Sequence, residues 1–222
     1  MTIAAILLAA GRGERLGGPK GFVQLEGRPL LALALETVRQ CASVDVIVVL
    51  VPAGDEAQAR ELAGPDEIVA VGGNSRQASV RAGLDSLGDL GRPVDTVVVH
   101  DVARPLAPSA LFDEVIAGLG DADGVVPGIP VTDTVKRLDD GVVAETLPRE
   151  ALVAAQTPQA FRHEALRRGH ELAAKEGFQG TDDASLLERA GMRVVVVPGD
   201  PRNVKITEPH DLAVASLLAG PA

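Results

Sequence analysis

The segment Ile3-Ala4-Ala5-Ile6-Leu7-Leu8-Ala9-Ala10-Gly11-Arg12-Gly13-Glu14-Arg15-Leu16-Gly17-Gly18-Pro19-Lys20 joins an apolar run to a glycine-rich turn with spaced cations. The run from Ile3 to Leu8 is apolar at every position, which is typical of a strand buried on both faces. Gly11 and Gly13 lack side chains, so backbone N–H groups there can approach phosphate oxygens, while Arg15 and Lys20 bring positive charge. This order predicts a strand followed by a loop that binds a nucleotide triphosphate.

Two better-known phosphate loops do not fit this spacing. The P-loop pattern places Ser or Thr after Gly-Lys, whereas Lys20 stands between Pro19 and Gly21. The dinucleotide pattern requires a third glycine where Leu16 stands, and no acidic residue closes the second apolar run, which ends Leu50-Val51-Pro52. An ordinary flexible loop between strand and helix is the alternative. The two cations and the preceding strand favour phosphate binding.

Composition narrows the class of protein. The chain has 222 residues, of which 46% are hydrophobic, and this length suits one large α/β domain spanning residues 1–222. Only 2% of the residues are aromatic, there is no Trp or Tyr, and the formal net charge is −10. Nucleic-acid binding generally needs a basic groove, often with aromatic stacking platforms. We therefore expect no nucleic-acid partner, but a small phosphorylated ligand in a locally basic site.

The sequence shows no targeting or membrane segment. Residues 1–4 carry no basic region and enter a strand at once, and no apolar run reaches membrane-spanning length. The single cysteine, Cys41, lies in a segment with helical apolar spacing, where a small buried side chain is the usual role. We expect a soluble cytoplasmic protein.

Apolar, β-branched runs recur along the chain and alternate with segments of helical spacing. Pro29 opens one such helix, Ser75 caps a second, and Ser109 caps a third. This alternation predicts an α/β fold with a doubly wound, mainly parallel sheet. The strand runs are Ile3 to Leu8, Val44 to Val51, Ile68 to Val71, Thr96 to Val99, Gly124 to Val126 and Arg193 to Val197.

One stretch departs from the alternation. Residues 134–138 and 142–147 have the pattern of two short strands around the turn Asp139-Asp140-Gly141, which predicts an inserted β-hairpin. An isolated hairpin is only marginally stable in water, so it must dock on another surface. We expect that surface to be a second subunit, which makes residues 132–150 a dimerisation arm. The alternative is a hairpin folded back on its own sheet.

Polar clusters follow several of the predicted strands. In open α/β sheets, ligands bind beyond the carboxyl ends of the strands. The clusters are Gly11 to Lys20, Gly72 to Arg76, His100 to Pro105, and Asp200 to Lys205. If they meet at one edge, they surround a single cleft with Gly11, Gly13, Arg15, Lys20, Gly73, Asp101, Arg104 and Lys205.

The histidines offer no obvious catalytic base. His100 ends a buried strand and is interpreted as a structural histidine, while His163, His170 and His210 lie in charged helical stretches and are expected to be solvated. No spacing of Cys and His indicates a structural metal.

Taken together, the motifs resemble the 2-C-methyl-D-erythritol 4-phosphate cytidylyltransferase family over nearly the whole chain. The motifs that carry the resemblance are Ala9-Ala10-Gly11-x-Gly13-x-Arg15 with Pro19-Lys20, Gly72-Gly73-x-x-Arg76-x-x-Ser79-Val80, His100-Asp101-x-Ala103-Arg104-Pro105, Val131-x-Asp133-Thr134-x-Lys136, Arg149 with Gln156-Thr157-Pro158-Gln159-x-Phe161, Thr181-Asp182-Asp183-Ala184, and Asn203-Val204-Lys205-Ile206-Thr207. Their order is highly specific. The resemblance implies a Rossmann-like nucleotidyltransferase fold and in-line transfer of a cytidylyl group from CTP to a polyol phosphate.

The resemblance assigns roles to individual residues. Arg15 and Lys20 match cations that stabilise the transition state, and Arg149 and Lys205 match cations that hold the acceptor phosphate, helped by Arg104 and Thr134. A phosphate monoester is already ionised near neutral pH, so no general base is required. The CTP-binding positions are Ala10, Gly11, Gly13, Gly73, Asn74 and Ser79.

Further implications concern metal and assembly. Mg²⁺ is expected mainly on the triphosphate, with Asp101 either beside it as a candidate ligand or orienting the polyol. The hairpin matches a homodimerisation arm that carries Thr134 into the neighbouring active site. The chain ends at Ala222 after one helix, so we expect no cyclodiphosphate synthase domain of the kind fused to some relatives.

Two departures from the family pattern and two alternatives accompany this interpretation. Only four residues separate Arg15 from Lys20, and Asn74 stands where an acidic side chain is common. A ribitol-5-phosphate cytidylyltransferase would use the same cations. A nucleotide-binding module without chemistry is the second alternative, and retention of all four cations argues against it.

Overall fold

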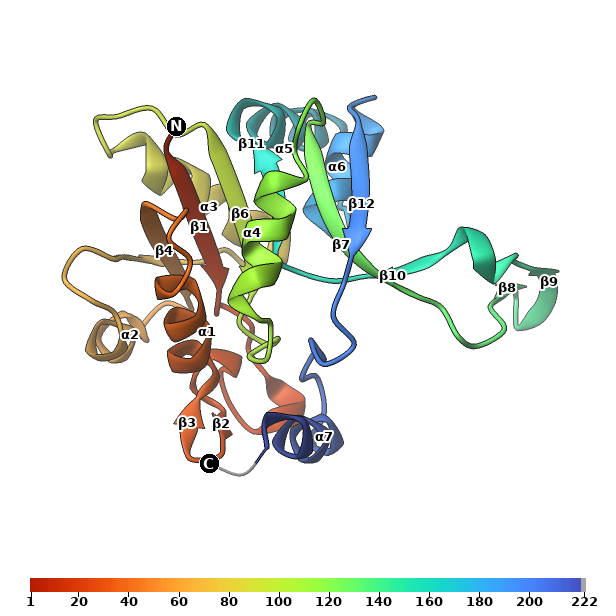
Figure 1. Ribbon diagram of the computed structural model, residues 1–222, viewed down its shortest axis with the longest axis horizontal. Coiled ribbons are helices and arrows are strands. Elements are labelled where there is room, and N and C mark those ends of the chain that lie inside the picture. Colours follow the sequence, from red (N-terminus) through yellow and green to blue (C-terminus); the bar gives the residue numbers. More distant parts are fainter. Residues whose placement is uncertain (221–222) are drawn as a thin grey trace.

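The computed structural model describes residues 1–220, in which an eight-stranded sheet runs through the centre (Figure 1). The strand order is β10-β7-β11-β6-β1-β4-β5, with β12 paired to β7 as well. Strands β5, β4, β1 and β6 are parallel to one another, and β12 is parallel to β7. Strands β10 and β11 pair antiparallel with their neighbours. The bounds are β1 Ile3–Leu8, β4 Val46–Val51, β5 Ile68–Val71, β6 Thr96–Asp101, β7 Gly124–Pro130, β10 Val153–Ala155, β11 Gln159–Arg162 and β12 Val194–Pro198.

Helices cover both faces of this sheet (Figure 1). On one face, α1 (Leu30–Arg39), α2 (Glu56–Leu62) and α4 (Ser109–Ala117) contribute to one core cluster. On the other, α3 (Arg76–Gly88), α5 (His163–Glu176) and α6 (Asp183–Arg189) contribute to a second. Alternate side chains of β1 point into opposite clusters, as a strand buried on both faces requires. The predicted doubly wound, mainly parallel α/β fold is confirmed.

A smaller cluster closes one end of the molecule. The C-terminal helix α7 (Pro209–Ala219) lies against the short strand β2 (Gln24–Leu25), which pairs with β3 (Arg28–Pro29). Leu25, Leu30, Ile206 and Ala215 form its buried centre. This packing places the segment that precedes α7 beside the loop that follows β1.

The starts of three helices test the predictions made from sequence. Pro29 directly precedes α1, and the Ser75 side chain caps α3 by accepting a hydrogen bond from the backbone N–H of Ala78 at 3.1 Å. The prediction for Ser109 is wrong. Pro108 is the N-cap of α4, so Ser109 is already the first helical residue and its hydroxyl makes no capping bond.

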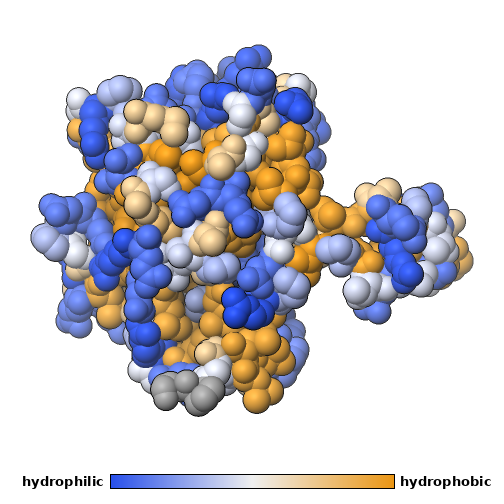
Figure 2. All heavy atoms as spheres, in the orientation of Figure 1, coloured by the Kyte–Doolittle hydropathy of each residue, from blue (hydrophilic) through white to orange (hydrophobic). Residues whose placement is uncertain are grey.

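The predicted hairpin forms from β8 (Lys136–Asp139) and β9 (Val142–Thr146). It projects from the body on an extended stalk and stands apart as a separate lobe (Figures 1 and 2). Every residue of both strands is exposed, including the apolar side chains of Leu138, Val142 and Val143. Within one protomer the hairpin therefore does not fold back on its own sheet, and that alternative is wrong.

A helix that spans a bilayer needs about 20 consecutive, mainly apolar residues. Among residues 1–220, no helix is both long and apolar enough to cross a membrane.

The packing of α3 on the sheet gives a stability prediction. A Cβ added at Gly83 would lie 2.9 Å from the side chain of Ile6, whereas a Cβ at Gly88, in the same helix, would meet open space. Alanine normally stabilises a helix relative to glycine by about 0.5–1 kcal/mol, but overpacking costs about 1–3 kcal/mol. Urea unfolding should show Gly83→Ala less stable than wild type and Gly88→Ala at least as stable. Equal effects of the two changes would contradict the close approach of α3 to β1.

Candidate functional site

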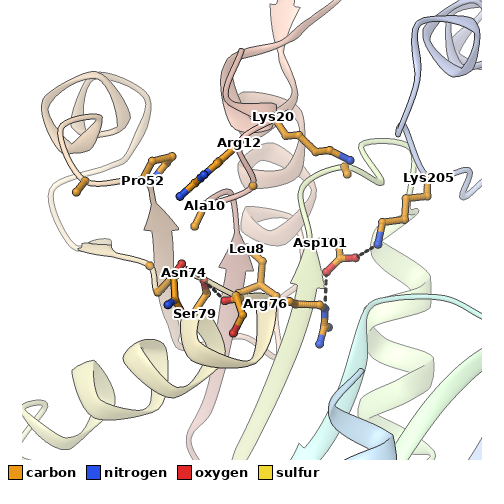
Figure 3. Close-up of a pocket in the computed structure, with 16 residues that line it drawn as sticks. Leu8, Ala10, Arg12, Lys20, Pro52, Asn74, Arg76, Ser79, Asp101 and Lys205 are labelled. Atoms are coloured by element: carbon orange, nitrogen blue, oxygen red, sulfur yellow. Dashed lines mark hydrogen bonds and ion pairs between the residues drawn. The ribbon is translucent and has the colours of Figure 1, made fainter. Parts of the chain in front are cut away.

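A cavity of about 450 Å³ opens beyond the carboxyl ends of the central parallel strands, where the sequence places its polar clusters. Its lining includes eight of the predicted site residues, which are Ala10, Gly11, Lys20, Gly73, Asn74, Ser79, Asp101 and Lys205. Figure 3 shows that the labelled side chains among them come from the loop after β1, the start of α3, the end of β6 and the segment before α7. Of the eight residues predicted to surround one cleft, the cavity lining contains five, which are Gly11, Lys20, Gly73, Asp101 and Lys205.

The loop after β1 is held in a tight backbone shape. Gly13 has φ +57°, and a Cβ there would overlap the carbonyl oxygen of Gly18, so only glycine fits without strain. The backbone N–H of Lys20 donates to the carbonyl of Gly11 at 2.9 Å, which closes the loop. Gly13 shapes the loop but does not belong to the cavity lining.

Lys20 is anchored across the cavity mouth. Its Nζ donates to the carbonyl oxygen of Ile206 at 3.1 Å. Partial burial, together with the positive charges of Lys205 and Arg15, lowers the pKa of Lys20. An anion bound beside Lys20 would offset this repulsion and raise the pKa of Lys20.

One wall of the cavity is made from small groups in close contact. A Cβ on Gly72 would collide with the Cβ of Ala10, and a Cβ on Gly73 would collide with Ala78. The Ser79 hydroxyl, on the first turns of α3, donates to the carbonyl of Ser75 at 2.9 Å. This wall offers backbone polar groups and one hydroxyl to a flat ligand of limited size.

Asp101 is the last residue of β6, and its carboxylate pairs with two cationic side chains of the site. Its Oδ1 accepts from Arg76 Nε at 3.2 Å, and its Oδ2 accepts from Lys205 Nζ at 2.7 Å (Figure 3). Burial alone would raise the pKa of this carboxyl, but the charges of Arg76 and Lys205 outweigh it and hold the pKa well below its usual range. Asp101 is thus a fixed anion flanked by two cations.

Arg104 and Arg15 do not line this cavity. The Arg104 guanidinium donates to the carbonyl oxygens of Asn203 at 2.7 Å and Ala155 at 3.3 Å, which ties together the two segments that contain these carbonyls. Arg15 Nη1 lies 2.8 Å from Glu208 Oε1 at the start of α7. Both side chains are near the site but engaged elsewhere.

Arg149 and Thr134 lie at the base of the arm. They line a second cavity of about 450 Å³ together with Leu147, Pro148 and other arm residues. Arg149 Nη1 donates to the carbonyl of Thr132 at 2.7 Å. One protomer therefore does not bring these two predicted residues into the cavity with Lys20 and Lys205.

Two arginines in the lining were not predicted as site residues. Arg12 points into the cavity from the glycine-rich loop (Figure 3), and its position among the loop glycines was the available signal. Arg76 belongs to the motif that carries the family resemblance, but its spacing on a helix gave no sign that its guanidinium turns inward to Asp101.

The structure agrees with the prediction for His100 but not with the prediction for His170. His100 is buried and satisfied, since its Nε2 donates to the Arg104 carbonyl at 3.3 Å and its Nδ1 accepts from the Thr157 hydroxyl at 3.1 Å. Burial lowers the pKa of His100 to about 4. The prediction that His170 is solvated is wrong, because it is buried on the inner face of α5 and donates to Asp183 Oδ1 at 2.9 Å.

Residues 1–220 do not form a resident metal site. Within residues 1–220 there is no group of three or more His, Cys, Asp or Glu side chains arranged to hold a metal ion. Both carboxylate oxygens of Asp101 are already paired with cations. A divalent ion in this cavity would have to arrive on a phosphorylated ligand.

Comparison with known proteins gives one consistent answer. The family model for 2-C-methyl-D-erythritol 4-phosphate cytidylyltransferase matches residues 3–220. The chain is 42% identical to the protein of that name from Geotalea uraniireducens, over 97% of this chain and 95% of the relative. It resembles the crystal structure of the 2-C-methyl-D-erythritol 4-phosphate cytidylyltransferase from Thermus thermophilus, with a TM-score of 0.81, 34% identity and 99% of each chain covered.

A second solved structure agrees. The 4-diphosphocytidyl-2C-methyl-D-erythritol synthase from Anaerococcus prevotii superimposes with a TM-score of 0.88 at 29% identity, over 99% of this chain and 96% of that one. The expected nucleotidyltransferase fold is therefore confirmed.

The buried imidazole of His100 predicts a pH dependence of stability. Its folded pKa of about 4 lies below the ordinary value of about 6.5, so its contribution is complete above pH 6.5 and is lost as the pH falls toward 4. The loss is on the order of 3 kcal/mol. Urea unfolding between pH 7.5 and 4.5 should show a shallower loss of stability for His100→Gln than for wild type. His210→Gln, at a side chain that is 73% exposed, is the control, and equal pH dependence of wild type and His100→Gln would refute the prediction.

Proposed function

The chain belongs to the 2-C-methyl-D-erythritol 4-phosphate cytidylyltransferase family, and we infer from this that it is a nucleotidyltransferase of the non-mevalonate isoprenoid pathway. It transfers a cytidylyl group from CTP to 2-C-methyl-D-erythritol 4-phosphate, giving 4-diphosphocytidyl-2-C-methyl-D-erythritol and pyrophosphate. The observation that carries this conclusion is the match over residues 3–220, with eight of the predicted site residues gathered at one cavity. A ribitol 5-phosphate acceptor is not favoured by these relatives.

The reaction is a direct displacement at phosphorus. A phosphate oxygen of the acceptor forms a bond to the α-phosphorus of CTP, and the bond from that phosphorus to the bridging oxygen of pyrophosphate breaks, so pyrophosphate leaves with the electron pair. The acceptor phosphate is largely ionised at neutral pH because its second pKa is about 6. No side chain has to remove a proton, which agrees with the structural role of His100.

Lys20 and Arg15 are proposed to stabilise the charge that gathers on the α-phosphoryl oxygens. Fixed cations aimed at these oxygens lower the barrier when they bind the transition state more strongly than the ground state. Lys20 already faces the cavity. To contact the phosphates, Arg15 would have to leave its ion pair with Glu208. An exposed ion pair contributes only about 0–1 kcal/mol, so a triphosphate can compete with Glu208 for Arg15.

The wall of Ala10, Gly73 and Ser79 is proposed to hold cytosine. Backbone groups and the Ser79 hydroxyl can read the amino and ring edges of the base, and the close contacts between Gly72 and Ala10 leave little space for a purine. Gly11 would turn its backbone N–H group to the phosphates, and Asn74 would contact the nucleoside. Gly13 would serve CTP binding by holding the phosphate loop in its tight shape.

The acceptor phosphate is proposed to bind Lys205, with Arg104 nearby and Asp101 orienting the polyol hydroxyls. Arg149 and Thr134 would come from the arm of a second subunit, because in their own chain they lie in a different cavity. The exposed apolar side chains of the arm support such a homodimer. Residues 1–222 would then form one nucleotidyltransferase domain with a dimerisation arm at about 132–150.

The proposal also includes Mg²⁺ as the metal ion and the cytoplasm as the compartment. Mg²⁺ would enter with CTP as part of the substrate, bound by the triphosphate, and would neutralise charge on the departing pyrophosphate. Asp101 would lie close to it rather than act as its main ligand. Cys41 is a free buried thiol, which suits the reducing cytoplasm.

Pyrophosphate release with CTP and Mg²⁺ tests the function directly. We expect strong preference for 2-C-methyl-D-erythritol 4-phosphate over ribitol 5-phosphate as acceptor. Preference for ribitol 5-phosphate would reassign the substrate while leaving the mechanism, and no release with either acceptor would refute catalysis.

Replacement of Lys20 tests its role in the transition state. Lys20→Ala should lower kcat by roughly 10²–10³-fold, as for loss of an oxyanion donor, and weaken CTP binding much less. Steady-state kinetics and calorimetric titration of CTP measure the two effects. Lys175→Ala, on the exposed end of α5, should change neither. Equal losses in kcat and CTP affinity would contradict the assigned role.

Subunit complementation tests the shared site. In mixed dimers of Lys20→Ala and Arg149→Ala chains, one of the two sites has both an intact cavity and an intact arm, so random mixing should restore about a quarter of wild-type activity. Lys20→Ala mixed with Lys205→Ala should restore none, because both changes lie in the same cavity.

Assembly is checked separately from activity. Deletion of residues 136–146 should convert a dimer to a monomer in light scattering. A deletion variant that remains a dimer, or dimeric mixtures without recovered activity, would show that the arm does not complete a partner's site.

A further inference from the structure

One continuous chain of side-chain hydrogen bonds runs from the interior of the protein to the cavity. His170 Nε2 lies 2.9 Å from Asp183 Oδ1, and Asp183 Oδ2 lies 2.6 Å from Arg76 Nη1. Arg76 Nε then meets Asp101 Oδ1 at 3.2 Å, and Asp101 Oδ2 meets Lys205 Nζ at 2.7 Å. The chain ends on the lysine proposed to bind the acceptor phosphate.

The inner half of this chain does not belong to the cavity. His170 on α5 and Asp183 on α6 have side chains that are 3% and 1% exposed, and neither lines the cavity. Asp182 caps α6 through a 3.0 Å bond from the backbone N–H of Ser185, which fixes the place of Asp183 at the start of the helix. A carboxylate this deeply buried must be paired, and Arg76 and His170 are its side-chain partners.

The contacts of Arg76 show what Asp183 does. Arg76 gives Nη1 to Asp183 and only Nε to Asp101, while its Nη2 is buried and has no hydrogen-bond partner within residues 1–220. Nε and Nη2 lie on the same edge of a guanidinium group, which is the edge that grips a carboxylate with two parallel bonds. Arg76 thus makes half of a two-bond contact with Asp101, and the bond to Asp183 holds it there.

We propose that Asp183, supported by His170, is a positioning residue for the acceptor phosphate. It restrains Arg76 to one oxygen of Asp101, and this leaves the other oxygen free to place the Lys205 ammonium at the cavity. The inference rests on the proposed function, because it treats Lys205 as the cation for the acceptor.

The proposal predicts a selective kinetic defect. Asp183→Asn removes the negative charge that holds Arg76. Arg76 should then turn and donate to both carboxylate oxygens of Asp101, and Lys205 would lose its contact with that carboxylate. The KM for the acceptor should rise about tenfold, while the KM for CTP stays within about twofold of wild type. Glu188→Gln removes an exposed negative charge from the same helix and should change neither constant.

A double-mutant cycle separates positioning from general damage. If Asp183 acts through Lys205, Asp183→Asn should have no further effect on acceptor kcat/KM once Lys205 is replaced by Ala. A purely structural effect would multiply with the loss from Lys205→Ala. Thermal unfolding of each variant identifies any that do not fold. The second variant is His170→Leu, which removes the hydrogen bond to Asp183 but leaves the Asp183 carboxylate in place. It should raise the KM for the acceptor by a smaller factor than Asp183→Asn does.

A crystal structure of Asp183→Asn gives a result that does not depend on activity. We expect Arg76 to contact both oxygens of Asp101 and Lys205 Nζ to leave hydrogen-bond distance of that carboxylate. The proposal would be overturned if the Asp101–Lys205 contact persists in this variant and Arg76 still donates only one hydrogen bond to Asp101. It would also be overturned if a folded and active Asp183→Asn enzyme has an unchanged KM for the acceptor. Absence of wild-type turnover would instead refute the proposed function and leave the crystallographic result to decide the positioning role.

Discussion

The site depends on how the protein compensates the buried charge of Asp101. A carboxylate removed from water costs several kcal/mol unless charged partners surround it. Here the two partners come from separate elements, Arg76 from the first turn of α3 and Lys205 from the segment before α7. Pairing the one anion therefore ties three parts of the chain together at the end of β6. It also fixes a cation at the cavity before any ligand arrives, so the reorganisation that a flexible lysine would need is avoided.

Most of the sheet could be predicted from sequence because its central strands are buried on both faces. The predicted run from Ile3 to Leu8 coincides with β1, and that from Ile68 to Val71 with β5. Strands β10 and β11 escaped prediction. β10 is apolar but only three residues long, and β11 is four residues long and contains the polar side chains of Gln159 and Arg162. Both are held by antiparallel pairing to distant strands, which no local pattern reports.

The site was predictable where residue type and position at a strand end carried the signal, as for Lys20, Asp101 and Lys205. It was not predictable where side-chain direction decided the outcome. Arg15 pairs with Glu208, and Arg104 donates to backbone carbonyls. His170 is an error that periodicity could have prevented, since it falls on the same helical stripe as the buried residues of α5, which are Ala165, Leu166, Gly169 and Ala173.

The proposed dimer accounts for two observations that a single protomer leaves without a reason. A two-stranded hairpin with exposed Leu138, Val142 and Val143 gains little stability by itself, so it needs a surface to cover its apolar side chains. Arg149 and Thr134, which the family resemblance assigns to the acceptor, lie at the base of that hairpin and away from Lys205. Docking of the arm on a neighbouring subunit would bury the apolar side chains of the hairpin. It would also bring Arg149 and Thr134 to the acceptor site of that subunit. On this arrangement catalysis would depend on assembly, because the acceptor phosphate would meet its full set of cations only where two chains adjoin.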